Sequence, residues 1–135
     1  MERKELIQSA KEMLSKAFVP YSKFPVGAAL LTKGGEVYQG CNIENAAYPV
    51  TCCAERVAIF KAVSEGEREF EALAVIANTE RPVPPCGSCR QVMSEFFEPD
   101  MRVYITSKEL EVKETTVKEL LPFSFTPGDL ESGRE

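Results

Sequence analysis

Val26-Gly27-Ala28-Ala29-Leu30-Leu31 is the stretch of sequence from which the fold can be inferred. A continuous apolar run of this length is typical of a strand that is buried on both faces of a sheet. Lys33-Gly34-Gly35 follows it as a tight-turn signal, and residues 36–41 alternate in polarity as a returning strand does. The two segments therefore predict a β-hairpin whose first strand lies inside the sheet.

Helices and further strands are predicted on both sides of this hairpin. Residues 3–18 carry apolar side chains at helical spacing, and Pro20 ends that helix. A second helix is predicted over 52–65, with Thr51 as its N-cap and Gly66 as its C-cap. The other predicted elements are a strand at 72–77, a helix from Pro84 to Phe97, strands at 101–106 and 111–113, and a short helix at 117–121.

The order of these elements indicates the fold class. Helices interleaved with buried strands predict an α/β protein, a three-layer α/β/α sandwich with a central mixed five-stranded sheet. The 135 residues, 44% of them hydrophobic, suffice for one domain with its own core and are too few for two. We expect a single domain over 1–135, with a frayed polar tail at 126–135.

The charge balance and the absence of histidine exclude several classes of function. The chain has 16 basic and 21 acidic residues, a net charge of −5. This balance argues against nucleic acid and against a membrane surface as the main partner. Because the chain contains no histidine, Ser-His-Asp triads and metal sites that need an imidazole are excluded. Carboxylates, thiols, Lys, Tyr or a metal held by sulfur must supply any chemistry near neutral pH.

The number of cysteines indicates a reducing compartment. Five cysteines cannot all pair within one chain. Residues 1–13 are charged and amphipathic, unlike a secretory signal, and no apolar stretch is long enough to span a bilayer. We therefore expect a cytoplasmic protein, in which such cysteines more often bind metal than form disulfides.

Two local patterns predict a metal site. Cys53-Ala54-Glu55 opens the second predicted helix, and Pro85-Cys86-Gly87-Ser88-Cys89 opens the third. Helix N-termini stabilise thiolates, and a C-x-x-C pair can present both sulfurs to one metal. If the two helix ends face each other, the three cysteines Cys53, Cys86 and Cys89 hold one Zn²⁺ and leave a fourth position for water, as in catalytic zinc sites.

Three charged residues beside these cysteines complete the predicted site. Glu55 lies two residues after Cys53 and is the candidate proton shuttle between zinc-bound water and the substrate. Three thiolates around one Zn²⁺ leave an excess of negative charge. Arg56 and Arg90 are expected to offset it by hydrogen bonds to the sulfurs.

Each of these residues also has a purely structural interpretation. Cys86 and Cys89 alone suit a redox pair or buried thiols, and Glu55 alone suits the dipole of its helix. The two arginines, taken alone, are more often solvated surface residues. Cys41 or Cys52 could be a fourth ligand, which would make the zinc site structural and closed, although both are more readily interpreted as packed thiols.

The zinc motifs, together with three further segments, resemble a known family. Cys53-Ala54-Glu55 with Pro85-Cys86-Gly87-Ser88-Cys89-Arg90-Gln91 resembles the zinc nucleoside deaminases, specifically the short, homotetrameric class of cytidine deaminases. The segments 20–29 (PYSKFPVGAA) and 40–48 (GCNIENAAY) and the C-terminal Leu120-Leu121-Pro122 with Phe125 resemble it as well. The resemblance covers nearly the whole chain, and this combination of motifs is highly specific.

The resemblance implies a nucleoside substrate and a set of residues that bind it. Asn42 and Glu44 are implied to hold the ribose hydroxyls, Phe24 to pack on the pyrimidine, and the backbone at Ala54 to read the edge of the base. The implied assembly is a homotetramer whose sites are shared between subunits. The residues implied to reach a neighbouring subunit's site are Ala46, Tyr48 and Phe125.

The same resemblance implies the reaction, which belongs to pyrimidine salvage. Zinc-bound hydroxide attacks C4 of cytosine while Glu55 protonates N3. Glu55 then helps to deliver a proton to the amino group, and ammonia leaves. Cytidine gives uridine in this reaction, and deoxycytidine gives deoxyuridine.

Three other functions agree less well with the sequence. A closed four-cysteine zinc module has no use for Glu55 beside the cluster. A deaminase that acts on RNA or DNA is disfavoured by the net charge and by Cys53, because such enzymes usually resemble a His-x-Glu pattern at that position. A deaminase of a modified cytosine nucleoside such as blasticidin S is disfavoured by the Asn42 and Glu44 pair, which suits ribose hydroxyls.

Overall fold

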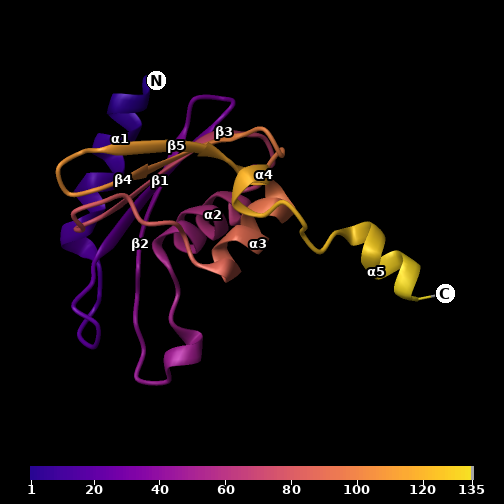
Figure 1. The fold of residues 1–135 in the computed structure, drawn as a ribbon, viewed down its shortest axis with the longest axis horizontal. Coiled ribbons are helices and arrows are strands. Elements are labelled where there is room, and N and C mark those ends of the chain that lie inside the picture. Colours follow the sequence, from indigo (N-terminus) through magenta and orange to yellow (C-terminus); the bar gives the residue numbers. More distant parts are fainter. Residues whose placement is uncertain (135) are drawn as a thin grey trace.

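A mixed five-stranded sheet forms the centre of the protein in a computed structural model that describes residues 1–134 (Figure 1). The strand order is β2-β1-β3-β4-β5; β3 and β4 are parallel, and the other neighbouring pairs are antiparallel. The sheet confirms the predicted hairpin and the mixed five-stranded arrangement. The strands are β1 (Val26–Thr32), β2 (Val37–Cys41), β3 (Phe70–Ala77), β4 (Arg102–Thr106) and β5 (Val112–Thr116).

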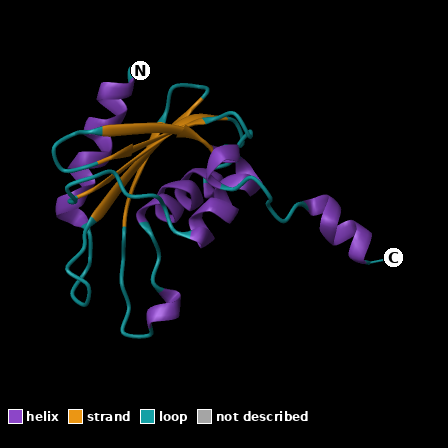
Figure 2. Cartoon of the chain, in the orientation of Figure 1, coloured by secondary structure: helices purple, strands orange, loops and turns teal. Residues whose placement is uncertain are grey.

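Helices cover both faces of this sheet and give the predicted three layers (Figure 2). α1 (Arg3–Glu12), continued by the 3-10 helix η1 (Met13–Lys16), packs on one face. α2 (Ala54–Ser64) and α3 (Gly87–Phe96) pack on the other. A helix with the length and apolar character needed to cross a membrane does not occur within residues 1–134.

Strand β1 supplies side chains to the cores on both faces. Ala28 and Leu30 lie in the core beneath α2 and α3, whereas Ala29 and Leu31 lie in the core beneath α1. This division follows from the alternation of side chains along a strand. The continuous apolar run is therefore explained by burial on two sides, as the sequence predicted.

Two glycines allow helices to approach the hairpin closely. A Cβ at Gly27 would overlap the carbonyl oxygen of Ala10 in α1, and a Cβ at Gly40 would overlap the backbone of Ala54 and Ala58 in α2. The missing side chains therefore set the distance between each helix and the sheet. Gly40 contacts the start of α2, because Ala54 is the first residue of that helix and directly follows Cys53.

The two helices beside the cysteines begin later than predicted. α2 begins at Ala54, so Cys53 rather than Thr51 is its N-cap. α3 begins at Gly87 with Cys86 as its N-cap, instead of beginning at the preceding prolines. Neither cysteine side chain caps its own helix by a hydrogen bond. As a result, both sulfurs remain available at helix N-termini, where partial positive charge accumulates.

Two C-terminal boundaries also differ from the prediction. Glu65 is the C-cap of α2, and Gly66 follows it with φ of 95°, a conformation that favours glycine. The tail that we expected to fray contains the helix α5 (Pro127–Gly133), whose start is fixed by a capping box between Thr126 and Asp129. α5 projects away from the body of the protein at the end of an extended segment (Figure 1).

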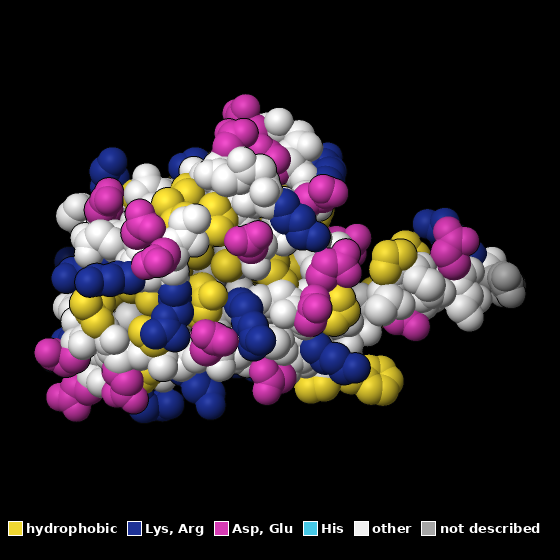
Figure 3. Space-filling model, turned by 90° about the horizontal axis from the view of Figure 1, so that it is seen from above, with side chains coloured by type: hydrophobic (Ala, Val, Ile, Leu, Met, Phe, Trp, Pro, Cys, Tyr) yellow, Lys and Arg dark blue, Asp and Glu magenta, His cyan; other side chains and the backbone are white. Residues whose placement is uncertain are grey.

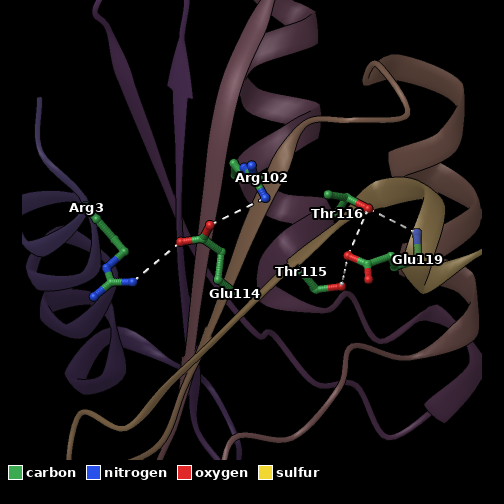
Figure 4. Close-up of polar contacts among 6 residues, drawn as sticks. All are labelled: Arg3, Arg102, Glu114, Thr115, Thr116 and Glu119. Carbon is green, nitrogen blue, oxygen red and sulfur yellow. Dashed lines mark hydrogen bonds and ion pairs between the residues drawn. The ribbon is translucent and has the colours of Figure 1, made fainter.

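Surface contacts tie α1 to the edge of the sheet (Figure 4). Glu114 on β5 pairs with Arg3 of α1 and with Arg102 of β4, each at 3.4 Å. Beyond it, the Thr116 hydroxyl caps the short helix α4 (Val117–Leu120). The three charged side chains are well exposed, so these ion pairs contribute little to stability.

Candidate active site

Three cysteine sulfurs meet at the N-terminal ends of α2 and α3. The Sγ atom of Cys53 lies 3.5 Å from that of Cys86, which lies 3.2 Å from that of Cys89. All three sulfurs are within 4.8 Å of one another. A tetrahedral zinc ion with bonds of about 2.3 Å holds its sulfurs about 3.8 Å apart, so this donor set fits one Zn²⁺.

The surroundings of the cluster stabilise negative charge on sulfur. Arg56 Nη2 donates a hydrogen bond to the Cys53 sulfur at 3.4 Å. The Cys89 thiol, hydrogen-bonded to Cys53, and the Arg56 guanidinium lower the pKa of Cys53 to about 5. The same contact with Cys53 raises the pKa of Cys89. The sulfur of Cys53 is therefore prepared to act as a thiolate ligand.

The remaining two cysteines lie apart from this cluster. Cys41 is buried, and its thiol donates to the carbonyl oxygen of Lys16 at 3.4 Å. Cys52 is half-buried and forms a backbone bridge with Ile43. Burial raises the pKa of both thiols. The metal-ligating group found among residues 1–134 thus has three cysteines, which leaves one position of a tetrahedral ion open, as in catalytic sites.

Arg90 occupies a different place from the one predicted. We expected hydrogen bonds from Arg90 to the sulfurs, but its Nε donates to the carbonyl of Pro85 at 2.8 Å and its Nη1 donates to that of Leu120 at 3.0 Å. The planar guanidinium satisfies two carbonyls, one in the loop before Cys86 and one at the end of α4. Arg90 therefore joins the cysteine loop to α4, and Arg56 is the arginine that contacts sulfur.

Glu55 is buried beside the cysteines in the first turn of α2. Its exposed fraction is 4%, and it lines the same cavity as Cys53 and Cys86. Desolvation by burial raises the pKa of Glu55 to about 7. A carboxyl group with such a pKa can both accept and release a proton near neutral pH. The sequence predicted the position of Glu55, whereas its burial is a result of the fold.

A cavity of about 640 Å³ extends from these residues to the surface. This volume lies in the usual range for small-molecule sites. Its apolar wall includes residues from the carboxyl ends of β3 and β4, the one parallel pair in the described sheet. Of the predicted site residues, those that line it are Phe24, Asn42, Glu44, Tyr48, Cys53, Ala54, Glu55, Arg56 and Cys86.

The carboxylate of Glu44 holds the loop that precedes β1. One oxygen accepts hydrogen bonds from the backbone amides of Tyr21 and Ser22, at 3.0 and 3.1 Å, and the other accepts from the Ser22 hydroxyl. The Ser22 hydroxyl is the main cause of a lowered pKa for Glu44. The buried carboxylate therefore remains ionised and fixes the loop at the rim of the cavity.

The amide of Asn42 fixes the next part of the same loop. Its Oδ1 accepts from the backbone amide of Val26 at 2.9 Å, and its Nδ2 donates to the carbonyl of Phe24 at 2.8 Å. These contacts hold the backbone of Phe24 so that its side chain lines the cavity. Each polar atom of Asn42 still has capacity for one more hydrogen bond.

Four predicted residues do not line the cavity of their own chain. Cys89 is fully buried, and Arg90 makes the contacts described above. Ala46 is exposed in the loop after β2, and Phe125 is 59% exposed near the start of the projecting C-terminal segment. The chain alone therefore does not bring Ala46 or Phe125 to its own site.

Several cavity residues were not predicted from the sequence. Ser22 belongs to a motif segment that gave it no role of its own, and the wall residues Val75, Ala77 and Ile105 carry only the pattern of buried strands. A fold-level rule could have indicated the wall, because sites in α/β proteins form beyond the carboxyl ends of parallel strands. That rule requires knowing which strands are parallel, which the sequence pattern alone did not establish.

Comparison with known proteins agrees with this geometry. A family model described as the cytidine and deoxycytidylate deaminase zinc-binding region matches residues 1–106. The chain is 56% identical over 135 residues to a cytidine deaminase of Sporosarcina psychrophila, covering 100% of this chain and 99% of the relative. It is 55% identical over 130 residues to a cytidine deaminase of Halalkalibacterium halodurans, covering 96% and 98%. A crystal structure of cytidine deaminase from Burkholderia pseudomallei has a TM-score of 0.90 and 47% identity, covering 93% of this chain and 100% of that one.

Proposed function

We propose that the protein hydrolyses cytidine and deoxycytidine to uridine and deoxyuridine with release of ammonia. The proposal starts from family membership: this chain belongs to the cytidine and deoxycytidylate deaminase family. The protein is a zinc-dependent hydrolase. The observation that carries the proposal is that a buried carboxyl group, Glu55, and two sulfurs of a three-cysteine cluster line one cavity of a size that suits a small molecule.

The three cysteines Cys53, Cys86 and Cys89 would hold one Zn²⁺ per chain. The ion, when bound, supplies Lewis acidity that lowers the pKa of water to about 7. The ligands come from two helix N-termini, and Arg56 donates a hydrogen bond to one of their sulfurs. This donation withdraws negative charge from the ligand and so maintains the acidity of the metal.

Glu55 is proposed to move the protons of the reaction. It gives a proton to N3 of the cytosine ring, takes one from water, and passes one to the amino nitrogen that leaves as ammonia. A pKa of about 7 suits this exchange because both forms of the carboxyl group are populated at neutral pH. Burial also keeps bulk water from competing for the same protons.

The rim of the cavity is proposed to bind the nucleoside. The ring of Phe24 packs on the pyrimidine, and the backbone at Ala54 reads the polar edge of the base. Asn42 and Glu44 bind the ribose hydroxyls with the hydrogen-bonding capacity that the loop leaves free. The loop contacts preorganise both side chains, which lowers the cost of ordering them on binding.

We infer that the protein is a homotetramer whose sites are shared between subunits. Two observations support this assembly. Phe125 and Ala46 lie away from the cavity of their own chain, and large apolar side chains are exposed on several elements, including Tyr48, Phe60 and Phe125. In the assembly, Ala46 and Phe125 would reach the site of a neighbouring subunit, with Phe125 closing over the base. Tyr48, which also lines the cavity of its own chain, would lie between the two sites.

We also propose that the protein works in the cytoplasm. All five cysteines are free, and Cys86 is exposed. A zinc site built of thiolates requires its sulfurs to remain reduced, and the cytoplasm maintains that state.

The direct test is to follow the fall in ultraviolet absorbance of cytidine at neutral pH while the zinc content and the mass of the same sample are determined. Turnover with about one zinc per chain supports the assignment, since a catalytic zinc site keeps one open position. One zinc per chain without turnover of cytidine or deoxycytidine would contradict it and would indicate a closed structural site or a modified nucleoside as substrate.

A further inference from the structure

We propose that Gln91 is a positioning residue that fixes Phe125 for its role in a neighbouring site. This inference rests on the proposed function, in which Phe125 closes over the base bound by another subunit. Gln91 lies on α3, two residues after the cysteine Cys89. It has no contact with the cavity of its own chain, so its effect on the reaction passes through Phe125.

The side chain of Gln91 binds the backbone of Phe125 with both of its polar atoms. Its Nε2 donates to the carbonyl oxygen of Phe125 at 2.9 Å, and the Phe125 amide donates to its Oε1 at 3.4 Å. The carboxamide thus pairs with this peptide backbone as an adjacent β-strand would. The two contacts define both the position and the orientation of the residue.

The backbone that follows Phe125 is ordered by the capping box of α5. The amide of Thr126 donates to Asp129 Oδ2 at 2.8 Å, and the Thr126 hydroxyl accepts from the Asp129 amide at 3.3 Å. Phe125 therefore stands between the Gln91 carboxamide, which belongs to the body of the protein, and the capped start of α5. Its ring is nevertheless 59% exposed. The C-terminal helix that follows extends clear of the body of the protein (Figure 3).

Phe123 provides an internal comparison. It lies two residues earlier in the same segment and is 97% exposed. Within residues 1–134, its backbone forms none of the hydrogen bonds that hold Phe125. Of these two exposed aromatic residues, only Phe125 is held in place before any partner binds, as expected for a residue that contacts a ligand.

The consequence of this arrangement concerns substrate binding. A ring whose backbone is already fixed loses little conformational freedom when a nucleoside enters the neighbouring site. Without the Gln91 contacts, that loss of freedom would be added to the cost of binding, and KM would rise while kcat remained nearly constant. Because Gln91 and Cys89 lie on one helix, α3 holds a metal ligand of one subunit and also positions the residue that covers the site of the next.

Gln91→Met tests the proposal because methionine has a similar length and lacks the amide. We expect KM for cytidine to rise about threefold to tenfold, with kcat, zinc content and oligomeric mass unchanged. Gln91→Asn, which keeps the amide but is too short to make both contacts, is expected to raise KM in the same direction. Glu95→Gln, an exposed substitution on the same helix, is the matched control and leaves KM unchanged.

A double-mutant cycle decides whether Gln91 acts through Phe125. In a Phe125→Ala background, Gln91→Met is expected to have no further effect on KM, and amide hydrogen exchange in residues 123–126 is expected to be faster in Gln91→Met than in the wild type. Two results would overturn this inference while leaving the proposed function intact, provided that the wild-type protein deaminates cytidine. One is an unchanged KM in Gln91→Met; the other is a rise in KM in the double variant that equals the combined effects of the two single substitutions. Failure of the wild-type protein to deaminate cytidine would overturn the proposed function and this inference with it.

Discussion

The two faces of the sheet share one construction, with a helix layer packed on alternate residues of β1. On one face, α1 packs over Ala29 and Leu31; on the other, α2 and α3 pack over Ala28 and Leu30. Each face also has one glycine at which the helix backbone touches the hairpin, Gly27 under α1 and Gly40 under α2. Both helix layers are therefore packed in the same way, on alternate side chains of β1 and against one glycine of the hairpin.

The faces differ in what their helices carry at the ends. The buried cluster under α1 consists of aliphatic residues from α1, β1 and β3. On the opposite face, α2 and α3 begin at the cavity, where their N-termini bring in the buried carboxyl group of Glu55 and the cysteine ligands. Side chains that alternate along β1 pack both layers, whereas the cysteine cluster and the buried carboxyl group lie at the N-terminal ends of α2 and α3.

The largest expected effect is that of Glu55→Gln on the α2 face. We expect kcat to fall by about 10³-fold, because the amide cannot transfer protons, while zinc content and stability are retained. Steady-state kinetics and metal analysis of the purified variant measure both. Glu65→Gln, an exposed substitution at the C-cap of the same helix, is the control and leaves kcat unchanged. Loss of zinc in Glu55→Gln, or a kcat near that of the wild type, would contradict the assigned role.

The two glycines allow the faces to be compared directly. Gly27→Ala and Gly40→Ala should each lower the free energy of unfolding by about 1–3 kcal/mol, because the added Cβ displaces a helix. Gly40→Ala displaces the start of α2 and should also weaken zinc binding and lower kcat. Gly27→Ala should leave kcat per bound zinc unchanged. Denaturant unfolding and zinc titration of both variants provide the comparison, and equal losses of zinc affinity in the two would refute the separation of the faces.

A smaller effect is expected from Ser22→Ala at the rim of the cavity. Loss of the hydroxyl removes a hydrogen bond to Glu44 and loosens the loop that carries Phe24, so KM should rise about threefold to tenfold with little change in kcat. Kinetics with cytidine measure this change. A fall in kcat with an unchanged KM would indicate that the loop serves the chemical step instead.

The same variant has a predicted pH dependence. The folded-state pKa of Glu44 lies below its ordinary value of 4.5, so the carboxylate stabilises the fold above that value and loses this contribution as the pH falls through the folded-state pKa. The stability difference between wild type and Ser22→Ala should therefore be largest at neutral pH and shrink in acid. Urea unfolding at several pH values tests this trend, and a difference that grows in acid would refute it.

The smallest effect is expected from Arg3→Ala on the α1 face. Its ion pair with Glu114 is exposed, so the loss should be below about 1 kcal/mol of unfolding free energy and should decrease at high salt. Neither kcat nor KM should change. Thermal unfolding at low and high salt, with one kinetic measurement, is sufficient. A change in KM would show that the α1 layer influences the site.

Local patterns allowed the elements to be predicted but not their ends. Apolar residues follow a regular pattern in the strand at Val26–Leu31 and in the N-terminal helix. Because such a pattern reflects which side chains are buried, it predicts the strand and the helix. Helix starts depend on one or two side chains. Thr51 has the chemistry of an N-cap, yet the helix begins after Cys53, because the position of the cluster and the close approach at Gly40 fix where α2 starts.

The sequence by itself determined the chemistry that is available: three thiols at helix starts, a carboxyl group two residues after one of them, and an apolar hairpin. These features are local, since a C-x-x-C pair and its helix are defined by neighbouring residues. Only the tertiary structure decided that Glu55 is buried with a pKa of about 7, and that Arg90 binds the carbonyls of Pro85 and Leu120. The physical reason is that desolvation and the choice among hydrogen-bond partners depend on atoms far apart in the chain, which folding alone brings together.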